Sequence, residues 1–228
     1  MSTETKVSKL VEALTEPAPG AKKEFLVTWD EVFVGPTESL PKPCLIAPLI
    51  RGIPALVLFK GQEVFLMMKG ADTRKFKHKL VLGVDTKTRL LAGTWTLRVA
   101  DEGDIPELTC IFHDCLQYGT DLITVQLTRL LRLSDQFEVP RGFNRQQIAS
   151  ESHGALFVKF QSARIFEGHL LAALWNKPNR RLRKFVVGGT LVIGGGPSPS
   201  YFAYPTDPYA AEAYLGDETL IVTAPPPL

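Results

Sequence analysis

Short apolar runs separated by polar turns fill most of this chain, a pattern that is typical of an all-β protein. The clearest example is a pair of runs, Lys77–Val84 and Arg89–Val99, joined by the polar stretch Asp85–Thr88. Two apolar runs on either side of so short a turn predict a β-hairpin. A second hairpin is expected between Ala55–Phe59 and Gln62–Met68, because a connection that ends in glycine allows a tight turn.

Further strands are expected wherever an apolar run alternates or is rich in β-branched and aromatic residues. These runs are Glu24–Val34, Glu107–Cys115, Ala155–Gln161, Ala163–Trp175, Leu182–Ile193 and Asp217–Thr223. The segment Thr120–Leu133 fits two interpretations. A helix that begins at Asp121 would place four apolar residues on one face, namely Ile123, Leu127, Leu130 and Leu131. The content of Ile, Val and Thr instead favours a strand over 121–128.

Helical spacing is clearest at the N-terminus. In Thr5–Leu14 the apolar residues Val7, Leu10, Val11 and Leu14 share one helical face. The prolines and glycine of Thr15–Gly20 predict the end of this helix and a linker. One more helical turn is expected at Gln146–Ser152.

Two segments are too rich in proline or glycine for regular structure. Gly35–Pro54 contains five prolines, which predicts an extended crossing segment with short edge pieces at most. Gly194–Tyr209 combines glycine, proline and aromatic residues. Its aromatic side chains predict an irregular segment that packs on the body of the protein.

About ten short strands with frequent turns predict a mainly β fold, namely an antiparallel β-sandwich or barrel with a short N-terminal helix and long Pro/Gly-rich loops. A parallel α/β fold is disfavoured, because it would need long helices between the strands. The chain divides into an N-terminal helical arm and linker (1–20), a β-rich body (21–193) and a Pro/Gly/aromatic-rich C-terminal segment (194–228).

Composition places the chain among ordinary globular proteins. With 45% hydrophobic and 22% charged residues, it can form a core and is not expected to be disordered. Three cysteines argue against a secreted disulfide framework and favour a reducing compartment. The polar N-terminus does not have the apolar core of a signal peptide, and no apolar run is long enough for a transmembrane helix. We therefore expect an intracellular, cytoplasmic protein.

No motif predicts a catalytic residue, a metal site or a cofactor. Cys110, His113 and Cys115 lie close in sequence, but strand alternation would place His113 and Cys115 on one face and Cys110 on the other. This spacing also lacks the second ligand pair of a structural zinc site. A Cys–His nucleophile pair with His153 has no local support. The pairs Glu151/His153 and Glu167/His169 are common on exposed strands, and Gly194–Gly196 is not followed by a phosphate-loop sequence.

Basic residues form two clusters, although the formal net charge is only +2. The first cluster comprises Arg74, Lys75, Lys77 and Lys79, and the second comprises Lys177, Arg180, Arg181, Arg183 and Lys184. Arg129, Arg132, Arg141 and Arg145 add further positive charge between them. Clustered cations bind a nucleic-acid backbone or anionic lipid headgroups, and they also keep exposed sheet edges from pairing.

The helical arm, β body, proline-rich crossings and basic turns together favour a non-enzymatic structural protein that self-associates and binds RNA, DNA or an anionic membrane through the basic clusters. This build is similar to that of viral capsid, matrix and movement proteins, an analogy at the level of the fold. The alternative is a small-molecule enzyme or carrier with a β-barrel pocket. Trp95, Phe112, His113 and Trp175 are the expected lining of that pocket.

Overall fold

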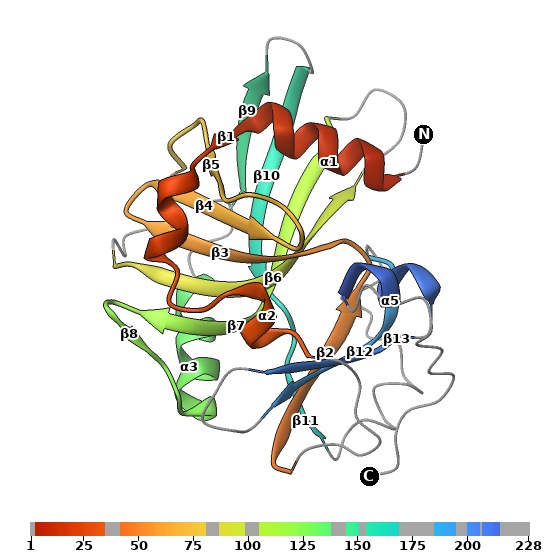
Figure 1. The fold of residues 1–228 in the computed structure, drawn as a ribbon. Coiled ribbons are helices and arrows are strands. Elements are labelled where there is room, and N and C mark those ends of the chain that lie inside the picture. The colour runs from red at the N-terminus through yellow and green to blue at the C-terminus, as the bar shows by residue number, and fades with distance from the viewer. Residues whose placement is uncertain are drawn as a thin grey trace.

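The computed structural model describes residues 3–34, 42–80, 87–98, 105–137, 145–150, 154–168, 185–194, 200–205 and 207–214. The protein is mainly β, as predicted, and is built around two sheets (Figure 1). The larger sheet has nine strands in the order β1-β5-β4-β3-β6-β7-β10-β9, and β8 pairs with β7. These strands are β1 (Thr15–Pro17), β3 (Ile53–Lys60), β4 (Glu63–Met68), β5 (Arg74–Phe76), β6 (Arg89–Arg98), β7 (Glu107–Tyr118), β8 (Asp121–Leu122), β9 (Arg145–Ser150) and β10 (Gly154–Ser162).

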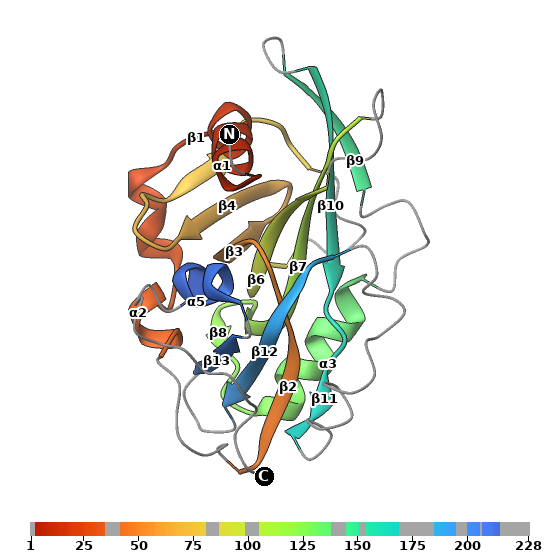
Figure 2. The same ribbon diagram turned by 90° about the vertical axis from the view of Figure 1, so that its right-hand side faces the viewer.

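The smaller sheet has four strands in the order β11-β2-β12-β13. They are β2 (Cys44–Ile50), β11 (Phe166–Glu167), β12 (Val187–Gly194) and β13 (Tyr201–Pro205). The helices are α1 (Thr3–Leu14), the 3-10 helix η1 (Pro19–Glu24), α2 (Trp29–Val32), α3 (Gln126–Phe137) and α5 (Pro208–Tyr214). Figures 1 and 2 show α3 and α5 on opposite sides of β12.

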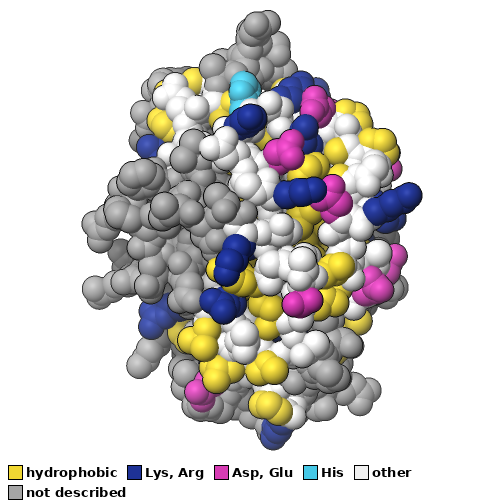
Figure 3. Space-filling view, turned by 90° about the vertical axis from the view of Figure 1, so that its left-hand side faces the viewer, with side chains coloured by type: hydrophobic (Ala, Val, Ile, Leu, Met, Phe, Trp, Pro, Cys, Tyr) yellow, Lys and Arg dark blue, Asp and Glu magenta, His cyan; other side chains and the backbone are white. Residues whose placement is uncertain are grey.

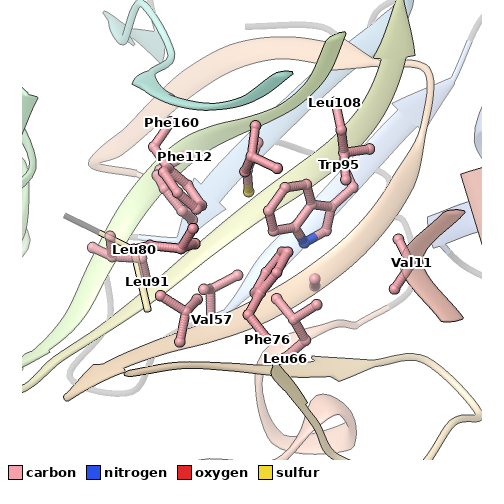
Figure 4. Close-up of a cluster of buried hydrophobic side chains, with 14 of the residues drawn as sticks. Val11, Val57, Leu66, Phe76, Leu80, Leu91, Trp95, Leu108, Phe112 and Phe160 are labelled. Carbon is pink, nitrogen blue, oxygen red and sulfur yellow. The ribbon is translucent and has the colours of Figure 1, made fainter. Parts of the chain in front are cut away.

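Both faces of the large sheet are buried, and this explains the continuous apolar runs of its central strands. In β3, Val57 belongs to one core together with Val11 and Leu14 of α1 and Leu133 of α3. The adjacent Leu56 points to the opposite face. There it belongs to a second core, to which β2, β12, β13 and α5 also contribute. Figure 4 shows part of the first core, where aromatic rings meet aliphatic side chains.

Several sequence predictions are confirmed. The N-terminal helix forms as α1, and the predicted strands at 107–115 and 155–161 form within β7 and β10. The hairpin of β3 and β4 also forms, with Lys60 paired with Glu63 across the turn. Gly61 has a φ of 59°, a backbone conformation that glycine adopts without steric cost.

The hairpin predicted from 77–84 and 89–99 is wrong. Residues 77–80 are not a strand, and 81–86 lie outside the described residues. The second run does form β6, but its two neighbours are β3 and β7. Strand β7 pairs with β6 over Arg89–Arg98 and β3 pairs with it over Arg89–Trp95, so the part of β6 that follows the turn already has a strand on each side. The short polar turn therefore does not join hydrogen-bonded partners.

Three local predictions had the wrong element type. The segment 24–34, expected to be a strand, contains the end of η1 and α2. Helix α2 begins after Thr28, which forms a capping box with Glu31 and so satisfies free amides at the helix start. The strand expected at 121–128 forms only at Asp121–Leu122, as β8, and α3 begins at Gln126. The helical turn expected at 146–152 is β9 over its described residues.

Strand β7 pairs with β10 in parallel, whereas the other strand pairings of the two described sheets are antiparallel. The crossover between them contains α3, so a single local α/β unit forms inside the larger antiparallel sheet.

In the part of the chain that the structure describes, Pro48 lies in a strand at a position where only one side has a neighbouring strand. In the region predicted to hold only edge pieces, Pro48 lies within β2 and pairs with Thr190 of β12. Strand β11 pairs with β2 only at Leu45 and Ile46, so the described residues provide Pro48 with no strand on its other side. This one-sided pairing explains why β2 tolerates a residue that has no amide hydrogen.

The C-terminal segment packs on the body, as predicted, but part of it is regular. Tyr201 and Tyr204 of β13 and Tyr214 of α5 are all buried. The edge strand predicted at 217–223 lies outside the described residues.

Candidate functional site

Cys110, His113 and Cys115 lie in the middle of β7 and are all buried. The prediction that His113 and Cys115 share one face of the strand is wrong. Cys115 instead belongs to the same core as Cys110. The pairing of β6 with β7 is irregular between Ala92 and Gly93, where an extra residue of β7 shifts the alternation. Burial raises the pKa of the Cys110 thiol well above its usual value, which disfavours the reactive thiolate.

His113 contacts a ring rather than an acid or a thiol. Its imidazole lies edge-on to Tyr201, with 4.9 Å between the ring centroids. Burial lowers the pKa of His113 to about 3, because the interior disfavours the imidazolium. His113 is therefore neutral near pH 7, and its Nε2 atom is buried without a hydrogen-bond partner. The described residues contain no group of three or more metal-ligating side chains.

A buried polar cluster that the sequence analysis did not identify lies beside His113. Asp114 of β7 accepts a hydrogen bond from the Tyr201 hydroxyl at 2.8 Å and one from its neighbouring backbone amide, that of Cys115, at 2.9 Å. The Asp114 carboxylate also forms an ion pair with Arg129 of α3, with 3.4 Å between Arg129 Nε and Asp114 Oδ1. Burial raises the pKa of Asp114 and outweighs the opposing effect of the Arg129 charge.

Arg129 and Gln126 connect α3 to the end of the smaller sheet. Arg129 Nη2 donates to the carbonyl of Gly194 at 3.1 Å, and the Gln126 amide donates to the carbonyls of Ile193 and Gly194. The polar cluster therefore joins β7, α3, β12 and β13. The sequence signals were one aspartate inside an apolar strand and one arginine inside an amphipathic helix, but neither revealed its partner.

The first basic cluster makes contacts within the protein. Arg74 Nε donates to Thr15 Oγ1 at 2.6 Å, and its Nη2 donates to the carbonyl of Thr15 at 3.1 Å. Lys77 donates to the carbonyl of Ala13 at 2.9 Å. These bonds satisfy carbonyl groups at the C-terminal end of α1, where a positive charge is also favourable.

Lys75 of the same cluster lies between two carboxylates, with 3.4 Å from its Nζ to both Glu16 and Glu63. Hydrogen bonds to Glu63 and Glu16 raise the pKa of Lys75. Lys79 is exposed. Figure 3 shows basic and acidic side chains interspersed over the upper part of the face that it draws.

The other predicted site residues are distributed as follows. The whole second basic cluster lies outside the described residues, as do Arg141, Glu151, His153 and His169. Arg145 forms an ion pair with Glu107, with 2.7 Å between Nε and Oε2, and Arg129 is buried.

The three described residues of the alternative pocket, Trp95, Phe112 and His113, do not gather around one cavity. Trp95 and Phe112 are fully buried, and each packs against Phe160, with ring centroids 5.6 and 6.0 Å apart (Figure 4). His113 contacts Tyr201 instead, and Trp175 lies outside the described residues. Two of the four expected lining residues are thus part of a packed core.

Large apolar side chains are exposed on and beside α3. We call this group the α3 surface: Leu122 of β8, Val125 before α3, and Leu127 and Leu131 of α3. Val125, Leu127 and Leu131 are 60%, 64% and 55% exposed. In Figure 3, hydrophobic side chains gather in the lower part of the face, at the level where Figure 1 places β8, α2 and α3.

Two cations lie next to the α3 surface. The guanidinium of Arg132 lies 4.4 Å from the centroid of the Tyr118 ring, and Lys87 Nζ lies 5.0 Å from the same centroid. Tyr118 pairs with Asp121, the residue before Leu122, so the cations and the aliphatic side chains are close. In the helix interpretation of the sequence, Leu127 and Leu131 share one helical face with Ile123 and Leu130.

No family model matches the chain, and no curated protein matches it significantly. None of the described helices is long and apolar enough to cross a membrane.

Proposed function

We propose that this chain is a non-enzymatic assembly protein, in which the β body is a scaffold that self-associates and contacts an anionic partner. The observation that carries the proposal is the α3 surface, where large aliphatic side chains are exposed beside Arg132 and Lys87. Contiguous exposed apolar side chains mark interaction sites, and arginine is enriched in such contacts.

The chemistry of the interior supports a structural role. Cys110, Cys115 and His113 are enclosed in the protein, and the Asp114–Arg129 pair is bonded to neighbouring elements. A catalytic group must reach its substrate, and these side chains do not reach the surface. Viral capsid, matrix and movement proteins share this general build, and a structural role of that kind is the most specific form of the proposal.

Self-association and anionic contact involve different parts of the chain in this proposal. Among the described residues, β9 has a strand on one side only, and an open edge of this kind pairs readily with a second copy. The cations proposed for the anionic partner are Lys79, the second basic cluster, and the two beside the α3 surface, Arg132 and Lys87. The bonds of Arg74 and Lys77 to the end of α1 assign these two residues a structural task as well.

Light scattering at low and high salt, with and without RNA or anionic vesicles, tests the proposal. We expect oligomers in the protein alone and larger complexes with an anionic partner that weaken as salt is added. Charge reversal of Lys177, Arg180 and Arg181 should reduce these complexes without dissociating the oligomer. A protein that stays monomeric at high concentration and binds neither partner would contradict the proposal.

A further inference from the structure

We propose that the α3 surface is a membrane-binding site, at which Val125, Leu127 and Leu131 enter the headgroup region of an anionic lipid bilayer. This inference rests on the proposed function, and it identifies the anionic partner that binds the α3 surface as a lipid bilayer. Helix α3 would lie in the plane of the interface rather than span the bilayer. Interfacial helices of this kind combine exposed apolar side chains with flanking cations.

The helix is fixed so that these side chains must face outward. Arg129 is fully buried and bonded to Asp114 and to the carbonyl of Gly194. Leu133 is buried in the core, and its carbonyl accepts a hydrogen bond from Ser162 at 3.1 Å. Because these contacts hold the inner face of α3 against β7, β10 and β12, the helix cannot rotate to hide Leu127 and Leu131 without breaking the Asp114–Arg129 pair.

The residues around the apolar tips suit a lipid headgroup layer. Arg132 and Lys87 both contact the ring of Tyr118, which concentrates positive charge beside the exposed leucines. A tyrosine ring is itself favoured at the boundary between acyl chains and headgroups. Asp121 is an exposed carboxylate at the same edge and would oppose binding to anionic lipid.

Lipid fits this surface better than the other partners. Nucleic acid is held mainly by cations that follow its phosphates, whereas aliphatic side chains dominate this surface. The centre of a stable protein interface is enriched in aromatic anchors, but the exposed tips here are valine and leucine. A bilayer accepts aliphatic side chains without any complementary shape.

Vesicle co-sedimentation tests the inference, with phosphatidylcholine vesicles that contain or lack phosphatidylserine. The unchanged protein should bind the anionic vesicles and bind the neutral ones much less. The double variant Leu127→Glu/Leu131→Glu should lose at least about tenfold in partition coefficient, because it removes buried apolar area and adds negative charge. Arg132→Ala should lose about fivefold, and Asp121→Asn should bind more tightly than the unchanged protein.

Val186→Glu is the matched control, because Val186 is 59% exposed and lies just before β12, whose opposite end at Gly194 contacts α3. It should bind vesicles as the unchanged protein does. Circular dichroism melting identifies any variant that is unfolded. If the double variant is unfolded, a second measurement replaces it: an environment-sensitive dye is attached to Leu131→Cys in a protein whose Cys44 is replaced by serine. The fluorescence of this dye must shift to the blue when anionic vesicles are added.

Other outcomes separate this inference from the proposed function. Salt-dependent binding to RNA without binding to vesicles would overturn the membrane site and leave the assembly function standing. The unchanged protein could instead form an oligomer that binds no vesicles and that Leu127→Glu/Leu131→Glu dissociates. This result would assign the surface to contact between copies and overturn the membrane site. A monomer that binds neither RNA nor vesicles would contradict both.

Discussion

His113 shows how burial alone can remove the chemistry of a reactive residue. Its imidazole lies against Tyr201, and its pKa is lowered to about 3 because the interior disfavours the charged ring. In the unfolded chain the same group titrates near its usual value of 6.5. The unfolded state therefore binds a proton that the folded state does not bind between these two values.

This difference predicts an acid-sensitive contribution to stability. The stabilising contribution is fully present above pH 6.5 and decreases as the pH falls toward 3. Between pH 7 and pH 5 it should reduce the free energy of unfolding by about 2 kcal/mol. The variant His113→Phe keeps a ring against Tyr201 and should lose about 2 kcal/mol less over the same range. Urea unfolding at both pH values measures this, and equal pH dependence in the two proteins would contradict it.

At the scale of elements, the first basic cluster stabilises the end of a helix. Arg74 and Lys77 donate to carbonyls of Thr15 and Ala13 at the junction of α1 and β1. The short β1 strand pairs with β5, on which Arg74 lies, so these bonds hold the N-terminal helix to the edge of the large sheet.

We therefore expect Arg74→Ala to destabilise the protein by about 1–2 kcal/mol, since it removes hydrogen bonds from a charged donor to the end of α1. Lys79→Ala is the control from the same cluster, because Lys79 is exposed. Its effect should stay within about 0.5 kcal/mol. Chemical denaturation gives both values, and equal destabilisation by the two variants would show that Arg74 has no special structural role.

At the scale of the whole molecule, one buried ion pair connects elements far apart in the chain. Asp114 lies on β7 of the large sheet, Arg129 lies on α3, and their other partners are Tyr201 and Gly194 of the small sheet. A buried pair is costly to desolvate, but the loss of one partner leaves the other charge without compensation.

A double-mutant cycle tests the role of this pair. Asp114→Ala should destabilise the protein by about 3–5 kcal/mol, because Arg129 keeps its charge in the interior. Arg129→Met should also be destabilising. The double variant Asp114→Ala/Arg129→Met should be clearly more stable than the sum of the single effects predicts. Additive effects in urea unfolding would contradict a direct coupling.

Local patterns predicted the elements whose partners are near in sequence. The hairpin of β3 and β4 depends on the glycine in its turn, and α1 depends on a regular apolar face. Helix α2 was missed although Thr28 and Glu31 have the spacing of a capping box, because the apolar alternation around it was given more weight. Segment 120–133 fitted both a helix and a strand, and residue type favoured a strand over 121–128. Helix α3 forms because Arg129 and Leu133 have buried partners.

The long-range contacts were beyond local patterns. Strand β6 pairs with β3 and β7 rather than with the run next to it, and nothing in its own sequence distinguishes these partners. The extra residues in β7 change which side chains face the same core, so the predicted faces of Cys110 and Cys115 were wrong. Asp114 and Tyr201 meet only because both sheets have formed.

The parallel pairing of β7 with β10 also affects how the chain folds. Phe157 pairs with Glu107, so 50 positions of chain separate the partners, and α3 and β9 must form within that interval. Closing so long a loop reduces the entropy of the chain before the contacts between β7 and β10 can stabilise it, and this slows folding. Until β10 pairs with β7, the backbone groups along this edge of β7 are unpaired and can bind a strand of another chain. Newly made protein is therefore most prone to aggregation at this stage, before its largest sheet is complete.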